Sequence, residues 1–561
     1  MTGHDAPDAG SWLLRRRYWG LGGLWSWGAA TIAALIVIPI LSVLVLAFNP
    51  TENIWPHLLA TTLPRYLANT AILTIGTAFL AASMGAGAAW LITMYRFPGA
   101  WLLEWLLFLP LAIPAYVGAY ALVDFLDYSG PVQGALREAM GWSSARDYWF
   151  FPVRSRAAAI AVLAAALYPY VYMLARAAYR EQSAGCYEVA RALGAGPLAR
   201  FWRVGLPLAR PAIAAGAAIV MMETVSDFGV VDYIGVQTLT TGIFTVWLEM
   251  GNPGGAAQIA CVILGIVLIL VVLEKTARRN SRYYQSARQS RPVVRISLRG
   301  ARAWLATVLC AIPVGIGFFL PVTVIALHAV DSPSAWISAG LARALLNTLF
   351  VGGAAAALTV TGALFMIYGV RLSGRRLPRL LLPVTTLGYA APGAVLAVGI
   401  LIPVAALDHR IADAWLALTG HDPGLLLTGT AAAIVLAYVV RFFAVAQGAT
   451  DTAFGRVSPA LPLAARSLGR TPGKTLREIY LPLMRSSVGT ALLLVFVDCV
   501  KELPATLLLR PFNYDTLATR VYEKASLENL AEAAPAALVV IAVGLVAVAL
   551  LARANLRRPE H

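Results

Sequence analysis

The sequence predicts an all-α polytopic membrane protein with about 12 transmembrane helices, built as two homologous halves of six. Hydrophobic residues make up 59% of the 561 residues and charged residues only 13%, a composition that excludes an ordinary soluble protein. Apolar runs of at least ~18 residues recur along the chain, each long enough to cross the hydrocarbon core of a bilayer as a helix. The two halves are indicated by an internal repeat, because the motif around Gly194 recurs with the same spacing around Gly469.

The predicted spans follow the apolar runs. In the first half they are residues 24–48, 68–95, 101–125, 156–178, 208–230 and 254–273. In the second half they are residues 302–328, 344–370, 380–406, 424–447, 483–508 and 533–552. The first run follows the basic cluster Arg15–Arg17, is too long for a signal-peptide core and lacks a small-residue cleavage site, so we predict an uncleaved first span.

Basic residues predict which side of the membrane the loops occupy. The net charge of +16 is concentrated in loops on one face, among them the basic segment 275–300. Because Lys and Arg gather in cytoplasmic loops, we expect both termini to be cytoplasmic, and this explains the charge without a nucleic-acid partner. The predicted domains are a cytoplasmic N-terminal segment (1–23), a first membrane-spanning half (24–274), a cytoplasmic linker (275–300), a second membrane-spanning half (301–553) and a cytoplasmic tail (554–561).

One polar, basic motif interrupts the apolar runs twice, at residues 187–211 and 462–486. The first copy contains Glu188, Ala190, Gly194, Leu206 and Pro207, and the second contains Ala465, Gly469, Ile479, Leu481 and Pro482. Each glycine predicts a left-handed turn between two short helices, and Pro207 is tolerated near the start of the next helix. Leu463 occupies the position of Glu188, so an ion pair made by that glutamate would be missing from the second copy.

Acidic residues recur within the predicted spans after both motifs. When the second motif is aligned on the first, Glu223 matches Asp498, Asp227 matches Glu502 and Thr241 matches Thr516. A spacing of four predicts that the two acids of each pair share one helical face. Since an acid inside the bilayer is costly, they suggest a watery or protein-lined pathway that also contains Lys501. The alternative is structural, with these acids pairing with Lys501 or capping helix ends.

Asparagines near the predicted outer ends of the second and eighth spans, Asn69 and Asn347, are expected to form hydrogen bonds between helices. The four cysteines and six histidines show no paired or ligand spacing, so no metal site, disulfide or cofactor is predicted in this chain. The sequence also contains no P-loop and no nucleophile–base constellation, so we do not predict an enzyme.

The spacing of Glu188, Ala190, Gly194 and Leu206-Pro207 resembles the EAA loop of bacterial ABC-type importer permeases. This resemblance implies the type I permease fold, in which each EAA loop is a short helix-turn-helix that docks into a separate ATPase subunit. Residues 223–233, 240–243, 501–506 and 510–520 are similar to fused ferric-iron permeases of binding-protein-dependent importers. That resemblance implies alternating-access import of ferric iron at the bacterial inner membrane, with a periplasmic iron-binding protein and a homodimeric ATPase that binds ATP-Mg.

Two alternatives remain at this point. One is an ABC permease for thiamine or another small solute, because only the segments after the loops favour iron. The other is a secondary transporter driven by an ion gradient, which would also contain repeats and membrane acids. The paired EAA-like loops argue against the second alternative.

Overall fold

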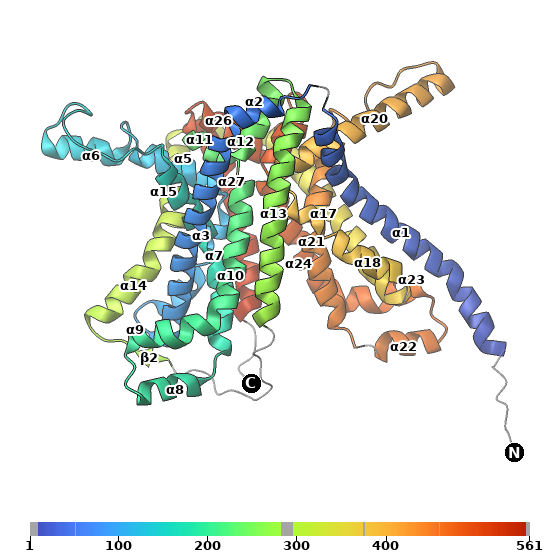
Figure 1. Ribbon diagram of the computed structural model, residues 1–561, viewed down its shortest axis with the longest axis horizontal. Helices are drawn as coiled ribbons and strands as arrows, with labels where there is room; N and C mark the ends of the chain where they lie inside the picture. Colours follow the sequence, from blue (N-terminus) through green and yellow to red (C-terminus); the bar gives the residue numbers. More distant parts are fainter. Residues whose placement is uncertain (1–8, 51, 282–294, 374–375, 459, 557–561) are drawn as a thin grey trace. The chain divides into compact units, whose positions relative to one another are not determined.

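The computed structural model describes residues 9–50, 52–281, 295–373, 376–458 and 460–556 (Figure 1). In these ranges, 11 helical segments are long and apolar enough to cross a membrane, and the bent pair Ala100–Ala112 and Ala115–Met140 raises the number to as many as 12. Strands are confined there to β1 (Tyr95–Arg96) and β2 (Ile296–Ser297), which pair in parallel. The predicted all-α polytopic architecture is therefore confirmed.

Internal contacts divide the chain into two compact units. Unit 1 comprises residues 1–45, 348–500 and 509–512. Its elements are α1 (Ala9–Phe48), α17 (Ala339–Ser373), α18 (Arg376–Val384), α19 (Leu387–Ala390), α20 (Gly393–Thr419), α21 (Ala431–Gly455), α22 (Ala460–Ser467), α23 (Pro472–Thr475), η6 (Leu476–Tyr480) and α24 (Leu481–Lys501). Three of these helices, α1, α17 and α24, continue past the limits of the unit.

Unit 2 comprises residues 46–347, 501–508 and 513–561. It begins with α2 (Trp55–Ala60), α3 (Leu63–Met94), β1, α4 (Ala100–Leu106), η1 (Leu109–Ala112), α5 (Ala115–Leu126), α6 (Pro131–Met140), α7 (Arg156–Glu181), α8 (Ala184–Ala192), α9 (Pro197–Arg200) and η2 (Phe201–Gly205). It continues with α10 (Leu206–Ser226), α11 (Gly229–Ile234), α12 (Leu239–Phe244), η3 (Thr245–Glu249), α13 (Pro253–Ser281), β2, α14 (Ala301–Val314), η5 (Gly315–Phe319), α15 (Leu320–Asp331), α16 (Pro333–Trp336), α25 (Pro504–Leu509), α26 (Leu517–Ser526) and α27 (Leu530–Leu556). Helices α3, α7, α10 and α13 pack together along their lengths, with α8 and α9 at one end (Figure 1).

The two units exchange the first spans of the sequence halves. Helix α1, from the first half, lies in unit 1, where Trp25 stacks on Phe365 with the ring centroids 4.4 Å apart. The segment α14–α15, from the second half, lies in unit 2, where His328 Nε2 is 2.9 Å from Asp124 Oδ2. Each compact unit therefore contains residues from both halves of the repeat.

Two predicted spans are broken, and two others are shorter than expected. Residues 101–125 do not form one straight span, since the chain bends by 97° around Pro110 and Pro114, which remove backbone donors. Residues 380–406 are divided among α18, α19 and α20, with Pro392 at the second break. The spans predicted at 208–230 and 483–508 stop at Ser226 and Lys501. Parts of three predicted segments, residues 1–8, 282–294 and 557–561, lie outside the described residues.

The repeated motif folds twice into the same series of elements. Helices α8, α9 and α10, with the π-helical turn η2 between the last two, correspond to α22, α23, α24 and the π-helical turn η6. Ser183 caps α8 by accepting a bond from the Gly185 N–H (3.3 Å), and Thr471 caps α23 by accepting one from Lys474 (3.4 Å). Such caps satisfy backbone donors that a helix leaves unpaired at its start.

Candidate functional site

The turn in each repeated loop has the predicted backbone. Gly194 has φ of 80° and Gly469 has φ of 77°, the left-handed conformation that favours glycine after a helix. The Ala195 N–H donates to the Ala190 carbonyl (2.9 Å), and the Arg470 N–H donates to the Ala465 carbonyl (3.0 Å). Both glycines have open space where a side chain would begin. The prediction of a glycine-dependent turn is thus confirmed in both copies.

The remaining motif residues occupy matched positions in the two loops. Pro207 and Pro482 are the second residues of α10 and α24, directly after Leu206 and Leu481. Glu188 and Leu463 are both exposed on the first short helix. Ala465 is buried, while Ala190 and Ile479 are at least partly exposed. The two loops therefore share a backbone but present different side chains at the Glu188 position.

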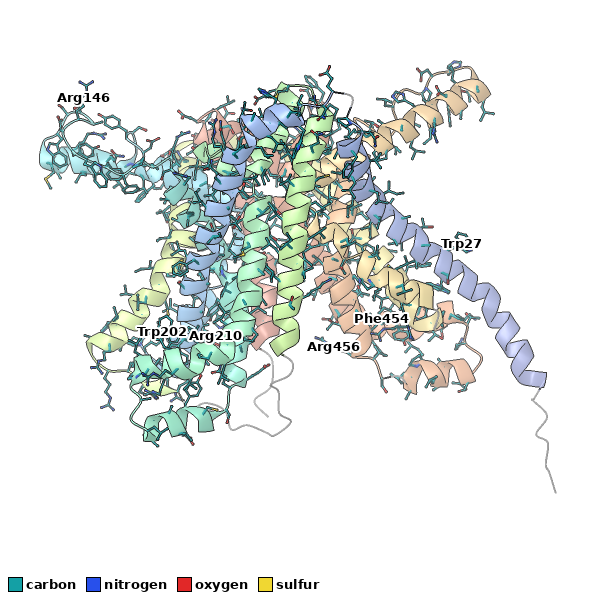
Figure 2. All side chains as sticks on the ribbon, in the orientation of Figure 1. Trp27, Arg146, Trp202, Arg210, Phe454 and Arg456 are labelled. Atoms are coloured by element: carbon teal, nitrogen blue, oxygen red, sulfur yellow. The ribbon has the colours of Figure 1, made fainter. Side chains whose placement is uncertain are left out.

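The turn presents apolar residues outward. Leu193 is 82% exposed and its counterpart Leu468 is 80% exposed. Trp202 is also exposed, and Figure 2 shows it with Arg210 at the end of unit 2 where α8 and α9 lie. Single exposed apolar residues are common, but a matched pair at the tips of two repeated loops suits contact with another protein.

An aromatic socket fixes the first loop to the end of α3. The Trp90 ring lies 5.4 Å from Tyr179, 5.7 Å from Tyr187 and 5.3 Å from Phe201, measured between ring centroids. Gly205 allows this approach, because a Cβ atom there would lie 2.3 Å from the Trp90 ring. The Tyr187 hydroxyl also donates to the Gln182 side chain. Packed rings therefore join the first loop to α3 and α7.

A second socket holds the second loop around Tyr368, the counterpart of Trp90. The Tyr368 ring centroid is 6.0 Å from that of Phe454 and 5.6 Å from that of Tyr480. The Tyr368 hydroxyl donates to the Pro472 carbonyl at 2.6 Å. Phe454 lies toward the end of α21 (Figure 2). Sequence reasoning missed both sockets, although aromatic residues at matching distances from Asn69 and Asn347 could have indicated them.

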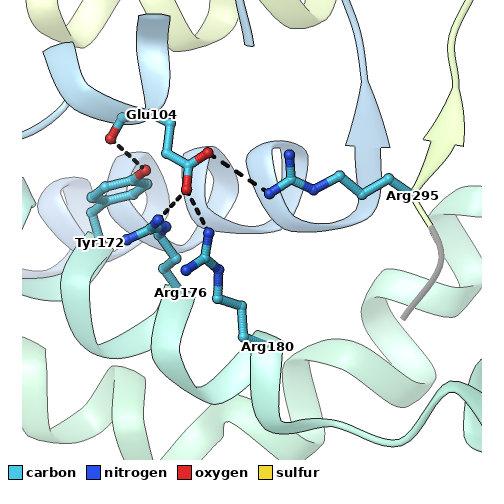
Figure 3. Close-up of polar contacts among 5 residues, drawn as sticks. All are labelled: Glu104, Tyr172, Arg176, Arg180 and Arg295. Atoms are coloured by element: carbon cyan, nitrogen blue, oxygen red, sulfur yellow. Dashed lines mark hydrogen bonds and ion pairs between the residues drawn. The ribbon is translucent and has the colours of Figure 1, made fainter. Parts of the chain in front are cut away.

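Behind the first loop, one buried carboxylate receives three arginines (Figure 3). Glu104 Oε1 accepts from Arg176 and, at 2.5 Å, from Arg180, while Arg295 Nη2 lies 3.7 Å from Oε2. The Tyr172 hydroxyl donates to the Glu104 backbone carbonyl at 3.2 Å. Glu104 and Arg176 are both buried. Burial makes each bond to this carboxylate important, since an unpaired charge in the interior is costly.

The second half replaces this arginine cluster with neutral hydrogen bonds. Leu382 occupies the position of Glu104, and the Gln447 side-chain amide donates to its backbone carbonyl at 3.0 Å. The Thr385 hydroxyl donates to Gln447 Oε1 at 2.5 Å. Asp451, the counterpart of Arg176, pairs with Arg371 at 2.8 Å on the surface. Only the bond to the backbone carbonyl is common to both copies.

The acids of the candidate pathway are arranged differently from the prediction. Helix α10 ends at Ser226, so Asp227 lies outside it and the prediction that Glu223 and Asp227 share one helical face is wrong. The same correction applies to Asp498 and Glu502, because α24 ends at Lys501. Asp227 Oδ1 accepts from the Val230 N–H (3.0 Å), and Glu502 Oε2 accepts from the Ala505 N–H (3.1 Å). These carboxylates satisfy the first backbone donors of α11 and α25.

The other three candidates lie on α10 and α24. Glu223 and Asp498 are half-buried within these helices. Lys501, the last residue of α24, donates from Nζ to the Leu111 carbonyl at 2.5 Å. In the described residues, no group of three or more His, Cys, Asp or Glu could hold a metal ion, and all four cysteines are free thiols.

Matching threonine caps correct one step of the sequence alignment. Thr238 and Thr241 form a capping box on α12, and Thr516 and Thr519 form one on α26. Thr238 therefore corresponds to Thr516 and Thr241 to Thr519, so the predicted match of Thr241 with Thr516 is wrong.

The two asparagines support the same correction, but each forms a hydrogen bond to a loop carbonyl and not to another helix as predicted. Asn69 Nδ2 donates to the Gln237 carbonyl at 2.8 Å, and Asn347 Nδ2 donates to the Asp515 carbonyl at 2.9 Å. Each of these carbonyls belongs to the residue directly before a capping box. The register of the repeat therefore shifts between the acids and the caps.

At the end of unit 2 away from the first loop, side chains from the two sequence halves form a hydrogen bond and an ion pair. The Tyr522 hydroxyl donates to Asp232 Oδ2 at 2.5 Å, and Arg154 pairs with Glu528 at 3.0 Å. Burial raises the pKa of Asp232 above its usual value, although the bond from Tyr522 opposes that effect. The first contact connects α11, from the first half, to α26, from the second, and the ion pair connects the segment before α7 to the residues that follow α26.

Comparison with known proteins gives consistent relatives. The family described as "Binding-protein-dependent transport system inner membrane component" matches residues 79–281 and 359–558. The chain is 26% identical to the Fe(3+)-transport system permease protein FbpB 2 of Haemophilus influenzae, over 85% of this chain and 87% of that protein. The putative ferric transport system permease protein FbpB 1 of the same organism is 24% identical over 74% of this chain and 65% of that protein. The molybdenum transport system permease protein ModB of Escherichia coli is 26% identical over 35% of this chain and 84% of that protein.

This chain has many candidate membrane spans, and the same loop of short helices occurs once in each sequence half. Together with the two family matches, this architecture defines a permease with two repeated transport modules. The chain belongs to the family of binding-protein-dependent transport system inner membrane components, with one family domain in each half. It is the permease component of an ABC importer. This membership places it in an inner membrane and associates it with a binding protein and an ATPase.

Proposed function

We propose that this permease imports ferric iron in an ATP-driven transporter with a separate, homodimeric ATPase. The observation that supports coupling best is the matched pair of loops, with left-handed glycines at Gly194 and Gly469 and an exposed leucine directly before each. The iron assignment is supported by the ferric transport permeases to which most of the chain is similar. ATP-Mg would be bound by the ATPase, and ferric iron would be delivered by a periplasmic iron-binding protein.

In the proposed mechanism, closure of the two ATPase subunits around ATP moves both loops. Leu193 and Leu468 insert into clefts of the ATPase, one on each subunit, and the aromatic sockets pass the movement to the spans. The permease then opens outward to accept iron from the docked binding protein. Hydrolysis of ATP resets the ATPase and opens the pathway inward.

The candidate pathway keeps its five residues in this proposal: Glu223, Asp227, Asp498, Lys501 and Glu502. Carboxylate oxygens are hard ligands that suit a hard cation such as Fe(III). Glu223 and Asp498 lie within the spanning helices α10 and α24, whereas Asp227 and Glu502 lie just beyond the ends of these helices and accept bonds from backbone N–H groups. The contacts to iron would be weak and transient, since high-affinity selection belongs to the binding protein.

The proposed topology has both termini and both loops in the cytoplasm. It retains the predicted segments 1–23, 24–274, 275–300, 301–553 and 554–561. The positive-inside rule supports it through the basic residues around the loops and linker. Labelling of single cysteines introduced at Leu193 and Leu468 of a variant whose four native cysteines are replaced by serine, in sealed vesicles of known orientation, tests the side directly.

The deciding experiment is uptake of radiolabelled Fe(III) into vesicles that contain the permease, its ATPase and its binding protein. We expect ATP-dependent uptake of iron, and its loss in the Gly194→Asp, Gly469→Asp double variant. The matched control is Gly473→Asp, because Gly473 lies in the second loop with open space around it and without a left-handed backbone. Parallel assays with thiamine and molybdate test other solutes.

Each result has a distinct meaning. Uptake of thiamine or molybdate without iron would keep the importer and remove the iron assignment. Iron uptake that persists in the double variant would contradict coupling through the loops. Uptake without any ATPase would instead indicate a transporter driven by an ion gradient.

A further inference from the structure

The arginine cluster behind the first loop, Arg176, Arg180 and Arg295 around Glu104, carries more positive charge than its carboxylate neutralises. Three guanidinium groups share one carboxylate, which leaves two positive charges in excess among these four side chains. Arg176 is buried, but the side chains of Arg180 and Arg295 remain 39% and 32% exposed. An anion could therefore reach two of the arginines from the surface.

Arg176 supplies an unused donor to this cluster. Its Nη2 is bonded to Glu104, while its buried Nε has no hydrogen-bond partner among the described residues. A buried donor without a partner is unfavourable, and the planar guanidinium is suited to binding phosphate oxygens with more than one N–H. The excess charge and the two exposed guanidinium groups, those of Arg180 and Arg295, therefore favour a phosphate-like ligand.

The surroundings of the arginine cluster are typical of a membrane interface. Helix α4, which carries Glu104, exposes Trp101 (74%) on its surface, and α14, which packs against α4, exposes Trp304 (63%). The Thr307 hydroxyl joins α14 to the segment before α4 by donating to the Pro98 carbonyl at 2.8 Å. Tryptophan is enriched where membrane helices meet the headgroup region. The cluster also lies at the end of α7 that leads into α8, hence at a membrane boundary.

We propose that the arginine cluster binds the phosphate group of an anionic phospholipid in the leaflet on the side of the coupling loops. Basic pockets between membrane helices are suited to acidic headgroups, and the exposed tryptophans would contact the same lipid near its glycerol region. The second half offers no equivalent, because Leu382 replaces Glu104 and Asp451 replaces Arg176. The lipid therefore binds one half of the permease only.

Lipid binding would hold Arg295, near the end of the linker, close to α7 and the first coupling loop. Arg295 comes directly before β2, which pairs with β1 at the end of α3, and α14 begins shortly after β2. A phosphate bridging Arg180 and Arg295 would join α7 to the segment that leads into the second half. This inference does not depend on the identity of the transported solute.

The test measures binding of phosphatidylglycerol to the full-length permease in neutral detergent by native mass spectrometry, with phosphatidylcholine and inorganic phosphate as separate ligands. We expect phosphatidylglycerol to bind more tightly than phosphatidylcholine. Arg180→Gln and Arg295→Gln should each weaken this preference roughly fivefold, the effect expected for one arginine near an anionic headgroup. The matched controls are Arg299→Gln and Arg302→Gln, which alter exposed arginines of the same region and should leave the preference unchanged.

Arg295→Gln keeps the test valid if the other variant folds poorly, because Arg295 lies outside any helix and its contact with Glu104 is 3.7 Å long. Equal binding of the two lipids would overturn the proposal, as would equal losses in the control variants. Displacement of phosphatidylglycerol by inorganic phosphate at equal concentration would assign the arginine cluster to a soluble phosphate and overturn the lipid.

Discussion

The two coupling loops have the same backbone but different supports. In both, a left-handed glycine closes the first short helix, and the N–H that follows this glycine donates back to an alanine carbonyl. In both, a side chain of the preceding span donates to a backbone carbonyl, from Tyr172 to residue 104 and from Gln447 to residue 382. The charges around that bond differ completely. The difference teaches that the loop geometry is the shared requirement, while the interior behind it is free to diverge.

The aromatic sockets show the same freedom through a change in size. Trp90 in the first half faces Gly205, whereas the smaller Tyr368 in the second half faces Tyr480. The pair of Trp90 and Gly205 in the first half is thus replaced by Tyr368 and Tyr480, whose rings pack edge to face in the second half. Packed interiors require such compensation when one residue changes size.

The largest expected effect on stability comes from replacing Glu104 by leucine, the residue that the second half has at this position. Glu104→Leu would leave the buried Arg176 without its partner, so we expect the free energy of unfolding to fall by about 3–5 kcal/mol. Thermal unfolding of the purified permease measures this change. The double variant Glu104→Leu, Arg176→Gln should recover part of the loss, because it removes the buried charge. A double variant no more stable than the single one would contradict the importance of the charge.

The next test fills the space opposite Trp90. Gly205→Ala places a Cβ atom 2.3 Å from the ring, and overpacking of this kind costs about 1–3 kcal/mol. We expect a lower unfolding temperature and weaker coupling of ATP hydrolysis to transport. Adding Trp90→Tyr, which copies the second half, should restore much of both. Gly489→Ala is the control, since that glycine has open space around it.

A smaller effect distinguishes capping from transport at the ends of α10 and α24. Asp227→Ala and Glu502→Ala remove acceptors from backbone N–H groups, and we expect each to cost about 1 kcal/mol. Asp227→Asn and Glu502→Gln keep an acceptor oxygen and should be closer to the wild-type stability. If the amide variants are stable but import iron poorly, the charge itself serves the pathway. Normal import by both amide variants would limit these two acids to a structural role.

The smallest effect is expected on the loop surface. Leu463→Glu gives the second loop the residue of the first, and because the side chain is exposed we expect a change in stability of less than ~0.5 kcal/mol. Its measurable consequence is the affinity for the ATPase, obtained by titration of the two purified proteins. An unchanged affinity would mean that the Glu188 position does not contribute to docking.

Periodic features of the sequence were sufficient to predict the membrane fold and the turn in each coupling loop. The repeat itself located Gly194 and Gly469, and a left-handed turn follows from their position after short helices. The ends of α10 and α24 were predicted too late, although Pro504 at the start of α25 indicates a break just after Glu502. The arginine cluster could not be predicted, because Glu104 on α4 receives its arginines from distant parts of the chain, on α7 and directly before β2.

The exchange of first spans between the units constrains how the chain can fold during synthesis. Unit 2, which contains the first coupling loop, includes residues 513–561 and is closed by α27, where Gly544 lies directly against Ala112. In unit 1, α1 packs against residues 348–500, which are made much later than α1 itself. Helices α3, α7, α10 and α13 can pack together while the rest of the chain is being made, but neither unit is complete until the second half has been made. Cutting the gene between the halves would separate each unit from at least one span that the other half supplies.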